Sequence, residues 1–245
     1  MGLTLLLIDD LSDLSEIVPT DEQGLLSLVD LDPESSAIAS MRGLGDRYES
    51  LSGYYPRPKP VFFSEAMSYM GITGIFSPFT LEANYNNDVP SYIIPYTVCH
   101  ELAHLKGFMR EDEAGFLAYL ASAGSDSPVF RYSGTLNALQ YSLRQLYANS
   151  GSEVFSSVYA RIPERARAEI AQSMAYWEAH STTLTSMAKS ANDKYLAVNA
   201  QAGGTKSYGR MVDLMIKEYE DRIALEYGPK IAPYVLDKSE APQLN

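Results

Sequence analysis

Cysteine is almost missing from this sequence. Its 245 residues include one, Cys99, so no disulfide can form within the chain. Cysteine usage therefore does not reveal whether the protein works in an oxidising or a reducing compartment. Histidine is nearly as scarce, with three residues in all. Two of the three lie close together, at His100 and His104, so this segment is a candidate functional site.

Basic residues are outnumbered, with 19 Lys and Arg against 31 Asp and Glu and a formal net charge of −12. An acidic surface repels a phosphate backbone, so nucleic acid is a poor candidate partner. Long hydrophobic runs are missing too, because none approaches the roughly 18 apolar residues of a membrane-spanning helix. The apolar run 3–8 is too short to span, and it lacks the basic flank of a signal peptide. We expect the chain as given to be soluble.

The composition is that of a folded protein, with 46% hydrophobic and 20% charged residues. The pattern of apolar residues predicts a small sheet early in the chain and a helical bulk later, which is the α+β class. Residues 1–33 are expected to form an acidic, loosely ordered lead-in. Residues 34–227 are expected to form the main domain, with a helical part at its C-terminal end, and 228–245 a polar tail.

The expected elements follow from hydrophobic periodicity and from the positions of proline and glycine. Helices are predicted over 34–51, 92–106, 112–123, 134–148, 163–180, 182–197 and 207–226. Strand is predicted at 61–63 and within 72–85, with 79–85 the better half.

The segment from His100 to His104 reads His-Glu-Leu-Ala-His, an H-E-x-x-H motif. On a helix, residues i and i+4 share a face, so both imidazoles can reach one metal ion. Glu101 lies about 100° round the helix from His100, near enough to reach a water on that ion. The motif predicts zinc ligands at His100 and His104 and a catalytic base at Glu101. The alternative is that the two histidines make ordinary helix contacts.

A catalytic zinc site needs a third protein ligand and an open position for water. On the next predicted helix, Glu113 shares a face with Phe116 and Leu117, whereas Glu111 points roughly the other way. A carboxylate on the inward face needs a partner, and a metal ion is a suitable one. We therefore predict Glu113 as the third ligand, with Glu111 as the alternative. The helix dipole also favours acids at a helix start, which explains Glu111 without a metal.

These parts predict a zinc metalloendopeptidase, a hydrolase in which Glu101 takes the proton of a zinc-bound water that attacks a peptide carbonyl. The oxyanion needs a second donor, for which Tyr132 is the candidate and Arg131 another, although both could simply belong to a loop that caps the next helix. The strand before the motif could pair with substrate, so that Glu82 and Asn84 line the cleft. Plain sheet structure is the alternative for that strand.

Neither Cys99 nor His180 belongs to the predicted zinc site. Cys99 lies off the metal-facing side of the helix and is expected to be a buried core thiol. No partner motif surrounds His180, so no catalytic role is expected for it.

Three blocks resemble a bacterial family catalogued as domain of unknown function 3810 (DUF3810). They are His100–Ala114 (HELAHLKGFMREDEA), Phe130–Gly134 (FRYSG) and Lys206–Asp213 (KSYGRMVD). More distantly, the chain resembles gluzincin-type zinc peptidases, in which the Glu of a Glu-Ala pair on the following helix completes the zinc site. That resemblance implies a zincin-like fold and assigns the third ligand to Glu113. Gly115 departs from it, because such families often have Asn or Asp there.

Members of the DUF3810 family usually carry transmembrane helices before this region. The resemblance therefore implies a native protein anchored in the cell membrane, with this domain facing outward. Nothing in the present sequence contains that anchor.

Two further functions compete with an active peptidase on peptide or protein substrates. One is a catalytically silent zinc-binding sensor or protein-interaction domain, and the other is a helical interaction domain in which the motif is a coincidence. A domain that only binds zinc has no need of Glu101, so this residue favours catalysis.

Overall fold

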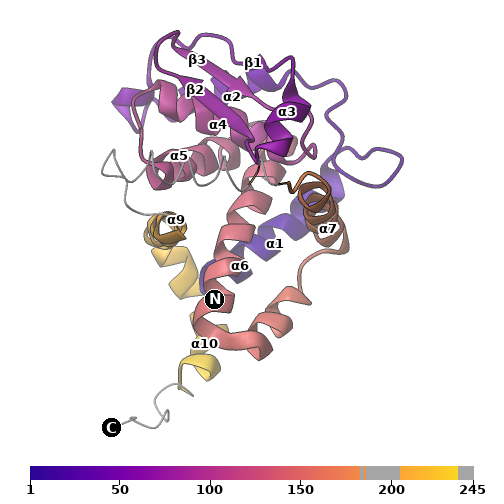
Figure 1. Ribbon diagram of the computed structural model, residues 1–245. Helices are drawn as coiled ribbons and strands as arrows, with labels where there is room; N and C mark the ends of the chain where they lie inside the picture. The colour runs from indigo at the N-terminus through magenta and orange to yellow at the C-terminus, as the bar shows by residue number, and fades with distance from the viewer. Residues whose placement is uncertain (183–184, 186–204, 237–245) are drawn as a thin grey trace, which may run out of the picture.

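The computed structural model describes residues 1–182, 185 and 205–236, and it is mostly helical with one small sheet (Figure 1). The helices are α1 (Gly2–Ile17), α2 (Pro33–Gly43), the 3₁₀ helix η1 (Glu49–Leu51), α3 (Ser64–Tyr69), α4 (Ile93–Leu105), α5 (Glu111–Ala123), α6 (Pro128–Tyr159), α7 (Glu164–Ala179), α9 (Thr205–Glu218) and α10 (Glu220–Leu236). The strands are β1 (Lys59–Pro60), β2 (Gly74–Ser77) and β3 (Glu82–Tyr85). The predicted α+β class is confirmed.

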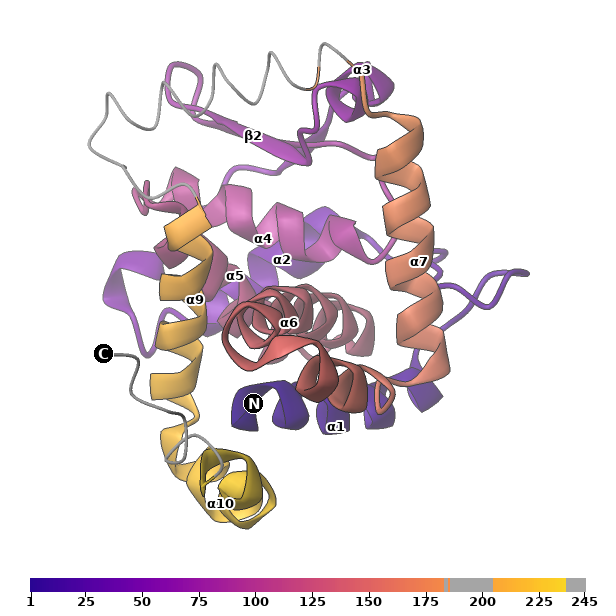
Figure 2. The same cartoon turned by 60° about the horizontal axis from the view of Figure 1, so that its bottom comes forward.

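Helix α6 runs through the middle of the molecule and contacts α1, α4, α5 and α9. Figure 2 shows α7 and α9 on opposite sides of it, with α1 below and α4 between it and the sheet. The helices share one core of buried side chains, which includes Leu6 from α1, Leu102 from α4, Leu139 from α6 and Met211 from α9. The histidine motif therefore lies on a helix that is packed on several sides.

Helix α1 contradicts the expected lead-in over residues 1–33. Its apolar residues, among them Leu3, Leu7 and Leu11, recur at helical spacing and are buried against α6. The acidic residues Asp9 and Asp10 lie on the outer side and pair with residues of α10. A run too short to span a membrane is thus long enough to make a core helix.

The sheet has the order β1-β3-β2. Strand β3 is central, parallel to β1 through Lys59↔Asn84 and antiparallel to β2 through Ile75↔Asn84. The strand predicted at 61–63 is found at 59–60. The strand predicted over 79–85 begins only at Glu82, because residues 78–81 form the turn from β2, with Leu81 at a φ of 53°. Both β2 and β3 contact α4.

The helices of the second half of the chain begin, bend and end at other residues than predicted. Helix α6 is longer than expected and continues across a kink at Gly151, whose φ is 77°. The helix predicted over 207–226 is divided into α9 and α10, and α10 continues to Leu236 through the start of the expected tail. Nearly all of the helix predicted over 182–197, and residues 237–245, lie outside the described part. Within that part, no helix has the length and apolar character needed to cross a membrane.

The contact between α5 and α6 yields a stability prediction at Gly134. A Cβ added there would lie 2.5 Å from the Cβ of Ser122, and neither atom can rotate away. Gly134→Ala should lower the free energy of unfolding by about 1–2 kcal/mol, because overpacking outweighs the gain in helix propensity of about 1 kcal/mol. Urea unfolding checks this, with Gly43→Ala as the control because no atom lies within 4 Å of its added Cβ. Equal stability of the two variants would contradict the packing described for α5 and α6.

Candidate metal centre

Helix α4 carries the histidine motif and is held at its first turn by α6. The hydroxyl of Ser133 donates to the carbonyl of Tyr92 and accepts from the backbone N–H of Tyr96 at 3.0 Å. The core side of α4 is closed, since Val98 and Leu102 are fully buried. These contacts fix the direction in which the opposite face of α4 presents its side chains.

Three side chains converge beside α4. His100 Nε2 lies 3.2 Å from Glu111 Oε2, and His104 Nε2 lies 3.6 Å from Glu111 Oε1. The two imidazole rings are nearly perpendicular at 88°, with centroids 4.6 Å apart. One ligand atom from each residue lies within 4.8 Å of the others, so this group could hold a metal ion.

The chemistry of these donors fits zinc. Two imidazole nitrogens and one carboxylate oxygen are among the ligand sets that catalytic zinc uses, and they leave a fourth position open. The side chain of Glu111 is 44% exposed, whereas His100 and His104 keep 18% and 10%, so the group faces solvent from the carboxylate side. A substrate could reach it from there.

The third member of this group is Glu111, which the sequence left as the alternative, whereas the predicted ligand Glu113 is not part of it. The residue that α5 turns inward is Asp112, whose side chain is 3% exposed. The side chain of Glu113 is 42% exposed and pairs with Arg110 at 3.4 Å. The physical reason is that α5 is rotated from the expected orientation, with Asp112 at the core and Glu111 toward α4.

The two histidines differ in their electrostatic surroundings and in their hydrogen bonds. Burial, followed by the charge of His100, lowers the pKa of His104 to about 4, so this imidazole is neutral near pH 7. Its Nδ1–H donates to the carbonyl of Phe108 at 2.8 Å, which leaves Nε2 with a lone pair for a metal. His100 Nδ1, by contrast, is buried and has no hydrogen-bond partner among the described residues.

The Glu111 carboxylate and the His100 imidazole support each other. Burial favours the neutral form of each group and would raise the pKa of Glu111 and lower that of His100. Burial is the largest single effect on each group, but the hydrogen bond between them and the attraction of the nearby opposite charges together outweigh it, so the pKa of Glu111 is lowered and that of His100 is raised. The carboxylate therefore stays ionised beside the histidines, as a metal ligand must.

Glu101 lies on the neighbouring face of α4, against strand β2. It is 5% exposed, and burial raises its pKa to about 7. A Cβ added to Gly74 would lie 2.4 Å from Glu101 Oε1, so only glycine admits this carboxylate. Sequence reasoning missed Gly74, although a glycine within a strand often marks such a close approach.

A family model described as "Protein of unknown function (DUF3810)" matches residues 1–216. The chain belongs to the DUF3810 family. No curated protein and no solved structure matches it. The match covers α1 to α7 and most of α9, so the DUF3810 region contains every residue of the candidate centre.

Arg210 belongs to Lys206–Asp213, the last of the three segments that resemble the DUF3810 family, and it has a structural role. Its Nε donates to Asp112 Oδ2 at 2.7 Å, and Arg110 binds the same carboxylate at 2.7 Å. Burial would raise the pKa of Asp112, but the two guanidinium groups hold it below its usual value. The next residue, Met211, is buried against Tyr96. Helix α9 thus fixes the turn of α5 that begins with Glu111.

The predicted oxyanion donor Tyr132 is placed away from the histidines. Helix α6 already begins at Pro128, so the expected loop is helix and Tyr132 is fully buried within it. Its ring lies 5.4 Å from the guanidinium of Arg165 on α7, while the next residue, Ser133, faces α4. Arg131 is half-buried on the same turn, and its role stays a prediction.

The predicted substrate strand also needs correction. Strand β2 pairs along one whole edge of β3, and β1 pairs with Asn84 and Tyr85 on the other edge, which leaves little of β3 to bind a substrate strand. Glu82 pairs instead with Lys59, and the Asn84 amide donates to the backbone carbonyl of Glu82 at 3.3 Å. In the described sheet, β2 is the strand next to Glu101 with an outer edge open to a further strand.

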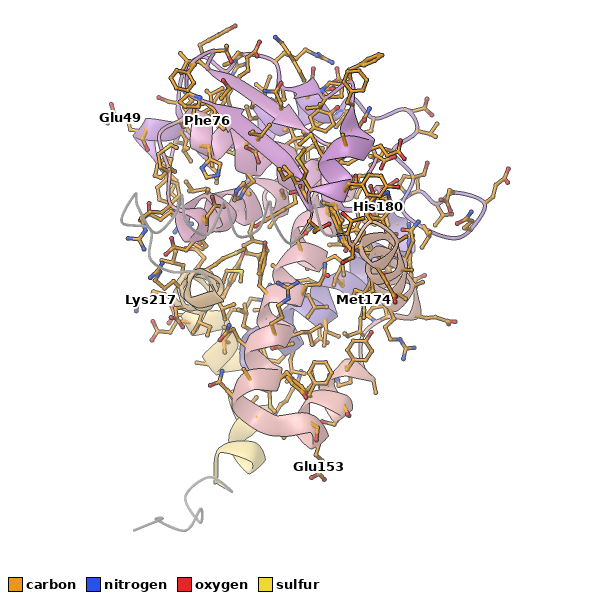
Figure 3. The ribbon with its side chains drawn as sticks, in the orientation of Figure 1. Glu49, Phe76, Glu153, Met174, His180 and Lys217 are labelled. Atoms are coloured by element: carbon orange, nitrogen blue, oxygen red, sulfur yellow. The ribbon has the colours of Figure 1, made fainter. Side chains whose placement is uncertain are left out.

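Cys99 and His180, for which the sequence predicted no metal-binding or catalytic role, lie outside the group of His100, His104 and Glu111. Cys99 is fully buried, as predicted, and burial raises the pKa of its thiol to about 12. His180 packs on Tyr176 with ring centroids 4.2 Å apart and lies at the α7 side of the molecule, away from Phe76 on β2 (Figure 3).

The placement of α5 predicts which carboxylate binds metal. Glu111→Ala should weaken zinc affinity by more than the roughly 10–100-fold that loss of an outer-shell partner costs, because a direct ligand is removed. Glu113→Ala is the matched control two residues away and should leave affinity within about threefold. Competition titration of zinc against a chelator measures both. A large loss in Glu113→Ala with none in Glu111→Ala would contradict the assignment.

Proposed function

We propose that this DUF3810 protein is a zinc-dependent metallopeptidase that hydrolyses peptide bonds in peptide or protein substrates. The observation that carries the proposal is the position of Glu101. A buried carboxylate with a pKa of about 7 lies one residue from a zinc-compatible group of two histidines and Glu111. A base with a pKa near the working pH is suited to proton transfer.

Each residue of the candidate site has its own role in the proposed hydrolysis. Zinc, when bound, supplies Lewis acidity toward a substrate carbonyl and activates a water molecule. His100, His104 and Glu111 hold the ion. Glu101 accepts the proton of the attacking water and can return it to the leaving amine, as the two directions of general acid–base catalysis require.

Strand β2 supplies a place for the substrate backbone. Its outer edge is open within the described sheet, and its first residue, Gly74, touches Glu101. An extended peptide that adds a strand to this edge would bring a carbonyl next to Glu101 through main-chain hydrogen bonds. This arrangement replaces the expectation that β3 binds substrate. The zincin-like fold implied by the sequence resemblance belongs to the same proposal.

The competing function is a catalytically silent zinc-binding sensor or interaction domain. It uses the same three ligands but gives no reason for a carboxylate at Glu101 against Gly74. We also propose, on the family resemblance, that the native protein is anchored in the cell membrane by a segment outside this chain, with this domain facing outward.

A pair of variants tests the function directly. Glu101→Gln keeps the size of the side chain and removes the base, so zinc content should be unchanged while peptide hydrolysis falls by at least about a hundredfold. His104→Ala should lose zinc and activity together. Metal analysis and a peptide library checked by mass spectrometry give both readouts. A wild-type protein without stoichiometric zinc would overturn the proposal, and full zinc without any cleavage would favour the sensor.

Gly74→Ala tests the contact between β2 and the base. The three atoms nearest to the added methyl group all belong to Glu101, so we expect it to displace the Glu101 carboxylate. We expect unchanged zinc affinity and a fall in kcat of about tenfold to a hundredfold, because a displacement of about 1 Å is enough for such a loss. Gly43→Ala, at the exposed end of α2, is the control. Full activity in Gly74→Ala would contradict a role for Glu101 at this position.

A further inference from the structure

A cavity of about 500 Å³ lies beside the candidate metal centre, between the start of α4, the middle of α6 and the end of α7. Figure 2 shows α7 standing next to α6 and α4 at this side of the molecule, with β2 above. Met174, on its α7 wall, is labelled in Figure 3. The volume is ample for a large amino-acid side chain.

The cavity lies close to the proposed catalytic residue Glu101. Thr97 lines it and lies one helical turn before Glu101 on the same face of α4, about 6 Å along the axis. Thr73 also lines it and directly precedes Gly74, the glycine in contact with Glu101. A substrate that reaches Glu101 along β2 therefore lies close to the residues that line the cavity.

The direction of β2 determines which substrate residue meets the cavity. The strand runs from Gly74 to Ser77, so the cavity lies at its beginning. Antiparallel pairing is slightly more stable per residue than parallel pairing, and an antiparallel substrate runs from the Ser77 end toward the Gly74 end. Residues downstream of the bond at Glu101 then extend toward Thr73 and the cavity.

The lining is aromatic and close to neutral. Four rings contribute to it, from Tyr92, Tyr96, Tyr141 and Trp177. One cation, Arg144, and one anion, Glu178, balance each other in charge. Aromatic rings in contact gain about 0.5–1.5 kcal/mol beyond the effect of buried area, which favours an aromatic guest over an aliphatic one.

Asn137 adds a polar feature to this lining. Its Nδ2 donates to the backbone carbonyls of Ser133 at 2.8 Å and Tyr92 at 3.4 Å, which fixes the orientation of the amide. Within the described part of the chain, its Oδ1 is then the atom left to accept a hydrogen bond from a guest. A phenol O–H can supply that bond.

We propose that this cavity, which we call the aromatic pocket, binds a large aromatic side chain, best a tyrosine, of the substrate residue that follows the cleaved bond. The proposal rests on the proposed function for the phrase "cleaved bond". The binding of an aromatic side chain is separable from it and can be measured without turnover.

Binding is measured on zinc-loaded Glu101→Gln protein. Trp177 is the single tryptophan of the chain and lines the pocket, so its fluorescence reports occupation of the pocket. Peptides acetyl-Ala-Ala-X-Ala, with X as Tyr, Phe, Leu or Ala, are titrated. We expect the Tyr peptide to change the fluorescence and to bind at least about tenfold more tightly than the Ala peptide, with Phe between them. Equal affinities, or no change in fluorescence with any peptide, would overturn the pocket.

Filling the pocket should abolish the preference. Gln140→Phe places a ring inside it from α6, and Met174→Phe does the same from the exposed wall on α7, where a loss of folding is less of a risk. Both should reduce the ratio of Tyr to Ala affinity to about 1–2. Glu153→Phe introduces the same ring at the far end of α6 and should keep the tenfold ratio (Figure 3). A preserved ratio in both filled variants would contradict the pocket.

Cleavage mapping separates the two proposals. If wild-type protein cuts a peptide library with Tyr or Phe directly after the broken bond, both are supported. Cleavage without that preference, or with the aromatic residue before the bond, overturns the pocket and leaves the peptidase. Selective binding of the Tyr peptide in a zinc-loaded protein that cuts no peptide overturns the peptidase and supports the pocket as a peptide-binding site.

Discussion

The ion pair between the buried carboxylate of Asp112 and the partly exposed guanidinium of Arg210 holds the candidate centre together. Asp112 is the residue after Glu111, and its carboxylate is bound by Arg110 from the same turn and by Arg210 from α9. A buried carboxylate without these partners would cost several kcal/mol, so the first turn of α5 is held at the point where both guanidinium groups reach it. That position directs Glu111 toward α4, where the two histidines share a face. The geometry of the candidate metal group thus depends on a helix far along the chain.

This dependence explains why the two histidines of the candidate group were predictable from the sequence and its third member, Glu111, was not. Helix α4 follows from local signals, and its predicted span of 92–106 agrees with 93–105. The orientation of α5 was inferred from its apolar residues alone, which favoured Glu113. The deciding contact joins residues separated by 98 positions, and no pattern within α5 contains it.

The other differences also come from tertiary contacts. Helix α1 has a clear apolar period, but its acidic residues suggested a solvated segment until α10 provided their partners. Tyr132 and Ser133 are adjacent in sequence, and only the packing of α6 decides that Ser133 faces α4 while Tyr132 faces α7. The role of Gly74 follows from the approach of Glu101 to the sheet. Sequence thus located the centre, and packing selected the residues that complete it.

The most direct test is the position of the metal itself. Crystals of the zinc-loaded protein, measured on both sides of the zinc absorption edge, should give one anomalous peak. We predict that it lies about 2.0–2.2 Å from His100 Nε2, His104 Nε2 and a Glu111 carboxylate oxygen. A peak bound by Glu113 in place of Glu111, or no peak near α4 at full zinc loading, would contradict the account.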